Sequence, residues 1–129
     1  VYAPVLNEMY YAIKGEGAWL RQDSQTIPLS AKSFALTDPG LRVVCSRSHL
    51  NDDTQAFVDA LDQPELVPKG SSLKFLILAK GEAHLYPRLG PTMEWDTAAA
   101  HAVALAAGFQ VTQKDEVTPL RYNKEDLTK

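Results

Sequence analysis

The segment 70–108 places the strongest constraint on how this chain can fold. Within it, residues 73–79 are apolar with the single exception of Lys74. A helix that is apolar on all sides has to be buried inside a larger structure. The alanine-rich stretch from about residue 97 to 107 predicts a second helix, which a glycine then ends. The chain therefore needs a layered core in which at least one helix is enclosed.

Strand-like and helix-like segments alternate along the chain after Gly40, which predicts an α/β fold with helices packed on a layered sheet. The first forty residues predict a β-hairpin and a third short strand on the same sheet, followed by a loop over 30–40. Another helix is expected over about 53–61, with Asn51, Asp52 or Asp53 as its cap. The expected strands are 8–13, 18–20, 26–29, 42–46, 65–69, 83–86 and 109–112, with a short one near 120–122.

Composition and length exclude several classes of protein. A chain of 129 residues, 45% hydrophobic and 22% charged, is typical of one soluble globular domain. A net charge of −3 without a basic block does not predict binding to a nucleic-acid polymer. No apolar run approaches the roughly 20 residues of a membrane span, so membrane association is not supported. The single cysteine, Cys45, lies in an apolar run, which predicts a buried thiol and is typical of a cytoplasmic protein.

Both ends of the chain resemble cut ends. The sequence begins with Val1 and enters strand-like sequence at once, and Lys129 follows an acidic run typical of a helix start. We expect residues 1–129 to be one domain of a longer protein. The alternative is a natural single-domain protein with a processed start.

The run Gly70-Ser71-Ser72-Leu73-Lys74 predicts a helix start that can bind an anion. Hydroxyl groups, free backbone N–H groups and the positive end of the helix dipole suit a phosphate. Lys74 is the only charge on this helix, and burying an unpaired charge costs free energy, so a phosphate is one explanation for it. The alternative is a serine cap with a lysine that reaches solvent. The local sequence favours neither.

Asp96, where the alanine-rich helix is expected to begin, is a candidate metal ligand. Mg²⁺ prefers oxygen ligands in strict octahedral geometry, so it needs a rigidly held carboxylate. Ala98, Ala99, Ala102 and Ala106 predict that this helix packs closely on the sheet and holds its first turn rigidly. The alternative is an ordinary helix cap. Since one aspartate cannot hold the metal, other ligands have to come from elsewhere.

Polar residues follow two of the expected strands. Ser46, Arg47, Ser48 and His49 come directly after a buried strand, and ligands of open α/β sheets bind beyond such strand ends. Arg88 follows another strand and offers a planar fork for a phosphate. The alternatives, a polar loop and a surface arginine, are favoured when each run is considered alone.

Trp95-Asp96-Thr97-Ala98-Ala99 resembles the second signature of the inositol monophosphatase superfamily of magnesium-dependent, lithium-sensitive phosphatases. Residues 70–74, 46–49 and 86–88 together resemble its 3′(2′),5′-bisphosphate nucleotidase branch, whose bacterial form is associated with sulfate assimilation. The inositol branch has an apolar residue where Lys74 stands. The resemblance spans nearly the whole chain and includes the runs 122–127 and 10–18.

The resemblance implies that this chain is the C-terminal half of a two-half enzyme. It implies Mg²⁺ as cofactor, held mostly by an N-terminal half through a glutamate and an Asp-Pro-Ile-Asp-Gly-Thr motif, neither of which is found here. We therefore expect this chain alone to be inactive. The implied reaction is hydrolysis of 3′-phosphoadenosine 5′-phosphate to AMP and phosphate by in-line attack of water on phosphorus. The implied roles are metal ligand for Asp96, contact with the non-reacting phosphate and sugar for Ser71, Lys74 and Arg88, and the adenosine side for Ser46, Ser48 and His49.

Two other functions remain open at this point. The chain could belong to an inositol or sugar monophosphatase of the same superfamily, which would require Lys74 and Arg88 to be ordinary surface residues. It could also be a non-catalytic domain that binds anions or a protein partner. Because a half of a protein normally packs against the other half, we also expect exposed apolar surface and a tendency to self-associate.

Overall fold

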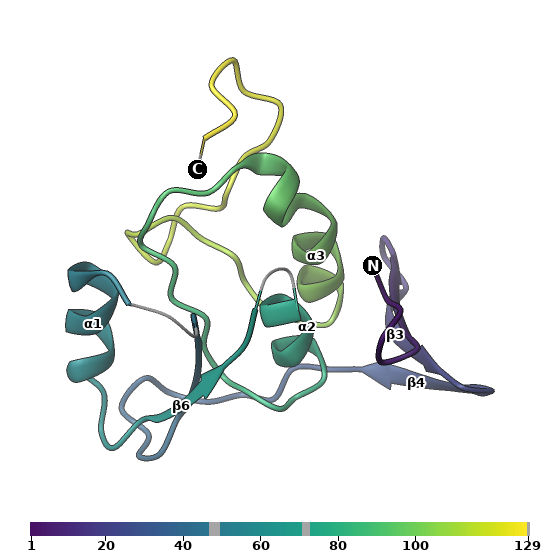
Figure 1. Cartoon of the computed structure of the whole chain (residues 1–129), viewed down its shortest axis with the longest axis horizontal. Coiled ribbons are helices and arrows are strands. Elements are labelled where there is room, and N and C mark those ends of the chain that lie inside the picture. The colour runs from purple at the N-terminus through teal and green to yellow at the C-terminus, as the bar shows by residue number, and fades with distance from the viewer. Residues whose placement is uncertain (47–49, 71–72, 129) are drawn as a thin grey trace.

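The structure is a computed structural model that describes residues 1–46, 50–70 and 73–128 (Figure 1). Strands and helices alternate between residues 42 and 79, which confirms the α/β class that the sequence predicts. The elements are β1 (Tyr2–Ala3), β2 (Glu8–Ile13), β3 (Gly17–Gln22), β4 (Gln25–Leu29), β5 (Arg42–Cys45), α1 (Asp52–Asp59), β6 (Glu65–Pro68), α2 (Leu73–Ala79) and α3 (Glu94–Ala106).

Strands β1 to β4 form an antiparallel sheet in their sequence order. The turn between β2 and β3 uses Gly15 at φ 81° and Gly17 at φ 139°, backbone conformations that favour glycine. The inner face of this sheet packs its buried side chains against both α2 and α3. On the outer face the paired residues Tyr11 and Trp19 stack with ring centroids 5.5 Å apart. One face of the sheet is therefore core and the other is aromatic surface.

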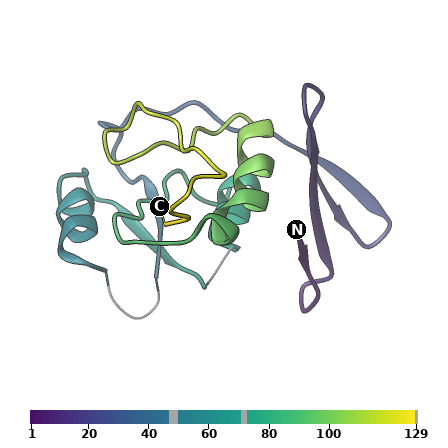
Figure 2. The same cartoon turned by 90° about the horizontal axis from the view of Figure 1, so that it is seen from above.

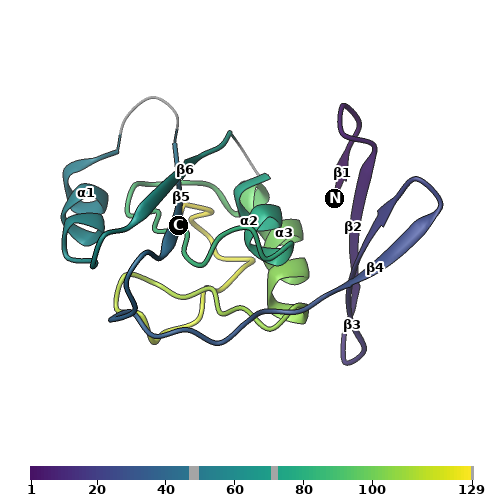
Figure 3. The ribbon, with the colours of Figure 1, turned by 90° about the horizontal axis from the view of Figure 1, so that it is seen from below.

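The second sheet is parallel and contains β5 and β6. The first forty residues were expected on this same sheet, and that expectation is wrong. Residues 30–41 lead away from β4, and α2 and α3 lie between the two sheets (Figures 2 and 3). Contacts of α3 with β2 and of α2 with β5 hold the layers together. Helix α1 lies at the end of the molecule remote from β1–β4 (Figure 3).

The strands expected after α2 are reduced to isolated bridges in the described residues. Leu85 pairs only with Val43, and Thr112 only with Pro119. Proline has no backbone N–H to donate to a ladder, so Pro87 and Pro119 limit both pairings. The strand expected near 120–122 is absent from the structure for residues 73–128.

The helices are confirmed, but one of them presents a different face. In α2 every described residue from Lys74 to Ala79 is buried, as an apolar helix requires. Helix α3 begins three residues earlier than expected, at Glu94. Its small residues Ala98, Ala99 and Ala102 are exposed, so the expectation that they pack on the sheet is wrong, whereas Ala106 is partly buried and packs against the core. The opposite face is buried through Thr97, Ala100, His101, Val103 and Ala104.

Two smaller expectations are confirmed. Asn51 caps α1, because its side-chain Oδ1 accepts the N–H of Thr54 at 2.8 Å. Cys45 is buried, and burial raises the pKa of its thiol although the Lys74 charge works in the opposite direction. Over the residues that the structure describes, no helix has both the length and the apolar character needed to cross a membrane.

Candidate functional site

Lys74 lies inside the molecule although it carries a charge. Only 4% of the residue is exposed. Its Nζ donates a hydrogen bond to Ser46 Oγ at 3.1 Å and lies 5.5 Å from the centre of the Tyr86 ring. The alternative in which this lysine reaches solvent is therefore wrong. Among the described residues, no carboxylate pairs with it.

The surroundings of Lys74 come from three separate parts of the chain. Ser46 follows β5 directly, Lys74 lies in the first turn of α2, and Tyr86 lies after the bridge at Leu85. The Tyr86 ring is held edge-on against Phe75, with ring centroids 5.3 Å apart. A hydroxyl and an aromatic face can solvate an ammonium group, but neither neutralises it. Within the part of the chain that the structure describes, the charge of Lys74 is therefore not compensated, which suits it to an anion.

Five residues of the motifs quoted from the sequence lie outside the described residues. They are Arg47, Ser48, His49, Ser71 and Ser72, and the structure gives no placement for them. Ser46 comes directly before the first three. The described partners of Lys74 are thus one part of the predicted binding site.

Asp96 is exposed in the first turn of α3. Its Oδ2 accepts hydrogen bonds from the Thr92 hydroxyl and from the Met93 backbone N–H, both at 3.3 Å. The carboxylate thus reaches back to the residue before the helix, an arrangement found in capping boxes. The alternative in which Asp96 is the ordinary N-cap of α3 is wrong, because Met93 occupies that position and Asp96 lies two residues into the helix. The same carboxylate remains open to solvent, where it can also meet a cation.

The first turn of α3 is fastened to the C-terminal segment through Glu94. This residue is only 7% exposed, and its carboxylate accepts Lys124 Nζ at 2.6 Å and the Asn123 N–H at 2.6 Å. The Lys124 N–H is a third donor at 3.4 Å. The hydrogen bond from the Lys124 side chain is the main cause that lowers the pKa of Glu94, and the backbone donors add to it.

A second set of hydrogen bonds lies one turn further along α3. The Tyr122 hydroxyl lies 2.6 Å from His101 Nδ1 and donates to Thr97 Oγ1 at 3.3 Å. The Thr97 hydroxyl in turn donates to the Glu94 carbonyl at 3.2 Å. Burial raises the pKa of Tyr122. Residues 122–124 were singled out in the sequence only through the family resemblance, because no local pattern links them to a helix that begins about thirty residues earlier.

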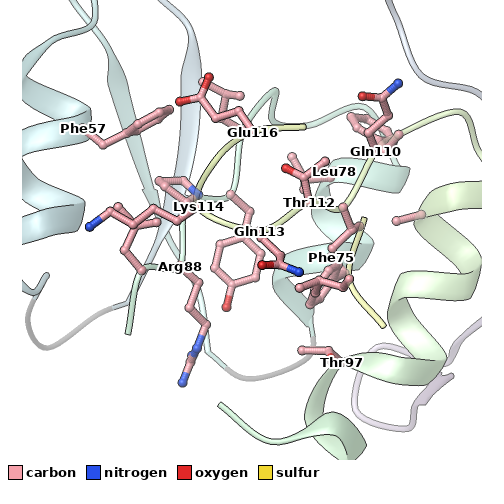
Figure 4. Close-up of a pocket in the computed structure, with 18 of the residues that line it drawn as sticks. Phe57, Phe75, Leu78, Arg88, Thr97, Gln110, Thr112, Gln113, Lys114 and Glu116 are labelled. Atoms are coloured by element: carbon pink, nitrogen blue, oxygen red, sulfur yellow. The ribbon is translucent and has the colours of Figure 1, made fainter. Parts of the chain in front are cut away.

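A cavity of about 1320 Å³ lies between α1, the segment 84–92, α3 and the C-terminal residues (Figure 4). Phe57, Phe75 and Leu78 give it an apolar wall. Arg88 lines it too, but its side chain extends away from Phe57 and Leu78 in Figure 4, and Nη2 donates to the Pro91 carbonyl at 3.2 Å. Ser46, Lys74 and Asp96 do not line this cavity. The structure therefore joins Ser46 with Lys74, whereas the hydrogen bonds given above for Arg88 and Asp96 go to neighbouring residues of their own segments.

Asp96 fits one ligand position of a magnesium site. Its oxygen atoms are the donor type that Mg²⁺ prefers. Within residues 1–46, 50–70 and 73–128, no three His, Cys, Asp or Glu side chains lie close enough together to hold a metal ion. The remaining ligands would have to come from outside the described part of the chain.

Comparison with known proteins assigns the chain to a family. The model of the inositol monophosphatase family matches residues 1–127. This chain belongs to that family. The 3′(2′),5′-bisphosphate nucleotidase CysQ of Salmonella typhimurium is 46% identical over 111 residues, and CysQ of Escherichia coli K12 is 45% identical over the same length.

Solved structures agree on the fold. CysQ from Bacteroides thetaiotaomicron, a bacterial member of the inositol monophosphatase family, superimposes with a TM-score of 0.84 at 38% identity and covers 98% of this chain and 53% of its own. SuhB of Mycobacterium tuberculosis, at 24% identity and a TM-score of 0.61 over 80% of this chain and 44% of its own, shows the fold alone. The matched region is 86% of this chain but 43% of the two curated nucleotidases, so the chain spans less than half of their length.

Proposed function

We propose that this chain is the C-terminal, substrate-binding part of a Mg²⁺-dependent phosphatase that hydrolyses 3′-phosphoadenosine 5′-phosphate to AMP and phosphate. One observation carries the proposal: Lys74 is a buried cation whose described partners are a hydroxyl and an aromatic ring. Burying such a charge is costly unless an anion is bound there. The likeness to CysQ nucleotidases supports a nucleotide that carries two phosphate groups.

The chain's own residues then have three roles. Lys74, Ser71 and Arg88 bind the phosphate that does not react and the sugar, so that their contacts orient the ester for attack. Ser46, Ser48 and His49 line the adenosine side. Asp96 is the one metal ligand that this part contributes. Bound Mg²⁺ supplies positive charge that stabilises the oxygen atoms of the reacting phosphate.

The partner of this chain is the N-terminal half of the same enzyme, and the surface offers it two apolar areas. The outer face of the antiparallel sheet exposes Tyr2, Met9, Tyr11 and Ile13. On α3, Trp95 is 67% exposed beside Asp96. Large exposed apolar areas mark interaction sites. We propose residues 1–129 as one domain that is inactive alone and that works in the sulfur metabolism of the cytoplasm.

An inositol or sugar monophosphatase is the second candidate, and the family to which the chain belongs favours it. That function would need Lys74 to be an ordinary surface residue. The enclosure of Lys74 argues against it. A non-catalytic domain that binds anions remains the third candidate and is separated from both by any measured turnover.

Phosphate release by the full-length protein with Mg²⁺ tests the proposal, with 3′-phosphoadenosine 5′-phosphate and inositol 1-phosphate compared side by side. We expect a preference for the nucleotide. Lys74→Met keeps the length of the side chain but removes its charge, and it should raise KM for the nucleotide about tenfold, equal to about 1.4 kcal/mol of binding free energy. Lys14→Ala, at the exposed hairpin turn, is the control. A preference for the inositol ester would favour the second candidate, and no release from either ester the third.

A further inference from the structure

We infer that residues 122–128, here called the strap, set the position of the Asp96 carboxylate, with Glu94, Lys124 and Tyr122 as positioning residues. The inference rests on the proposed function, in which Asp96 is a metal ligand. It goes further because it gives a task to residues that touch neither the substrate nor the metal.

A charged side chain, that of Glu94, is buried at the start of α3. Glu94 is the first residue of the helix, and its carboxylate receives two donors at 2.6 Å, the Lys124 ammonium and the Asn123 N–H. The Lys124 side chain is partly exposed, whereas that of Glu94 is almost fully enclosed. A buried carboxylate held by a charged donor and a backbone donor has little freedom to move. The first residue of α3 is therefore fixed to the strap.

The buried face of α3 determines the direction in which the Asp96 side chain points. Glu94, Thr97 and His101 follow one another at helical spacing, so their side chains share one face of α3. All three are buried and joined by the hydrogen bonds that include the Tyr122 hydroxyl. Trp95 and Asp96 lie on the exposed side of the same turn. Fixing the inner face therefore fixes the direction in which Asp96 points.

The backbone of the strap is also bonded to the backbone at the start of α3. The Glu94 N–H donates to the Leu127 carbonyl at 2.9 Å, and Met93 pairs with Thr128. The strap thus holds the residue before the helix as well as the helix itself. Figure 1 shows this yellow end of the chain beside the first turn of α3. A ligand carboxylate has to stay within about 0.5 Å of its working position, and the strap supplies that restraint.

The experiment measures Mg²⁺ binding by calorimetry in the full-length protein without substrate, together with phosphate release. The variants are Glu94→Gln, Lys124→Met and Tyr122→Phe, and the control is Glu125→Gln in an exposed position of the strap. Loss of groups that orient a metal ligand typically weakens metal affinity about tenfold or more. We expect that loss for Glu94→Gln and Lys124→Met, a smaller loss in the same direction for Tyr122→Phe, and KM for the nucleotide close to that of the control. Lys124→Arg, which keeps a charged donor, should restore most of the affinity.

Two results would overturn the inference, and they are distinguishable. If the unmodified protein binds no Mg²⁺, the proposed function fails and the strap loses its task with it. If the unmodified protein binds Mg²⁺ and the folded variants bind it as Glu125→Gln does, the strap is a structural fastening and the proposed function survives. Tyr122→Phe removes one hydroxyl only, so it decides the question if either charge variant does not fold.

Discussion

Glu8, in β2, is a buried carboxylate that holds one sheet to a helix of the other layer. It accepts hydrogen bonds from the Tyr10 hydroxyl, from Gln22 Nε2 at 3.2 Å and from Lys80 Nζ at 3.1 Å. Lys80 comes directly after α2 and also pairs with Glu82 at 3.4 Å. Burial raises the pKa of Tyr10, and its hydrogen bond to Glu8 adds to the effect. Burial works to lower the pKa of Lys80, but its bonds and ion pairs with Glu8 and Glu82 raise it overall.

These two raised pKa values predict a loss of stability in alkali. Tyr10 and Lys80 hold their protons more tightly in the folded protein than in the unfolded chain, where their ordinary pKa values are 10.0 and 10.5. Their stabilising contribution is therefore complete below pH 10.0 and is lost as the pH rises through the folded pKa values. Urea unfolding below pH 10.0 and at increasing pH above it should show the decrease, and Tyr10→Phe should show less of it. Identical curves for the two proteins would contradict the argument.

Lys80→Met tests the same contact at neutral pH. The substitution leaves the Glu8 carboxylate buried without its cation, which typically costs about 3 kcal/mol of unfolding free energy. Lys114→Met removes an ion pair with Asp53 in which both side chains are exposed, and there we expect less than about 1 kcal/mol. Equal losses in denaturant unfolding would show that the Glu8 site is not desolvated.

At the scale of elements, α3 separates what the sequence can predict from what it cannot. The existence of the helix and its end at glycine follow from composition, and the burial of α2 follows from its apolar residues. The face of α3 does not follow, because alanines lie on both sides of it and the pattern is nearly the same in every direction. Thr97 and His101 turn inward because Tyr122 supplies their partner. A contact over more than twenty residues leaves no trace in the local pattern.

Ala100→Leu and Ala99→Leu test which face of α3 is buried. Ala100 lies in the core against Phe75, so a larger side chain should overpack it and lower the unfolding free energy by about 1–3 kcal/mol. Ala99 is exposed, and the same change there should have little effect on stability. Thermal unfolding of the two variants gives the comparison, and a larger loss at Ala99 would reverse the assignment of the faces.

The candidate site also has one part that the sequence predicts and one part that it does not. The sequence predicts that the helix around Lys74 is buried, but it leaves open whether this lysine is enclosed or reaches solvent, and the structure encloses it. Its contact with Ser46 spans 28 residues and depends on how β5 and α2 pack, which local patterns do not contain. The expected strands near 83–86 and 109–112 shorten to bridges because Pro87 and Pro119 limit the pairing. The spacing of apolar residues alone does not predict that these prolines shorten the strands.

At the scale of the whole molecule, the two faces of the antiparallel sheet differ in how far they are covered. One face of the antiparallel sheet packs on α2 and α3, and its outer face exposes Tyr2, Met9, Tyr11 and Ile13. The exposure agrees with a chain that spans 43% of the relatives it matches.

We expect the isolated 129-residue chain to self-associate through this outer face. Light scattering over a range of concentrations should show a rising mean mass, because burying apolar surface stabilises contact between copies. Ile13→Lys should reduce the effect, whereas Val117→Lys, in an exposed turn away from the sheet, should not. A constant monomer mass at high concentration would argue against the prediction.

The short helix α2 between the sheets has a charged residue near each end, and each of the two has a specific hydrogen-bond partner. Lys74 serves the candidate site through Ser46, and Lys80 is tied to Glu8 in the other layer. Each residue added to a helix rotates the later residues about the helix axis by about 100°. An insertion or deletion within α2 would therefore let only one of the two lysines reach its partner. Relatives that carry both lysines should vary in length within loops such as 30–41, while the number of residues separating the two lysines stays constant through descent.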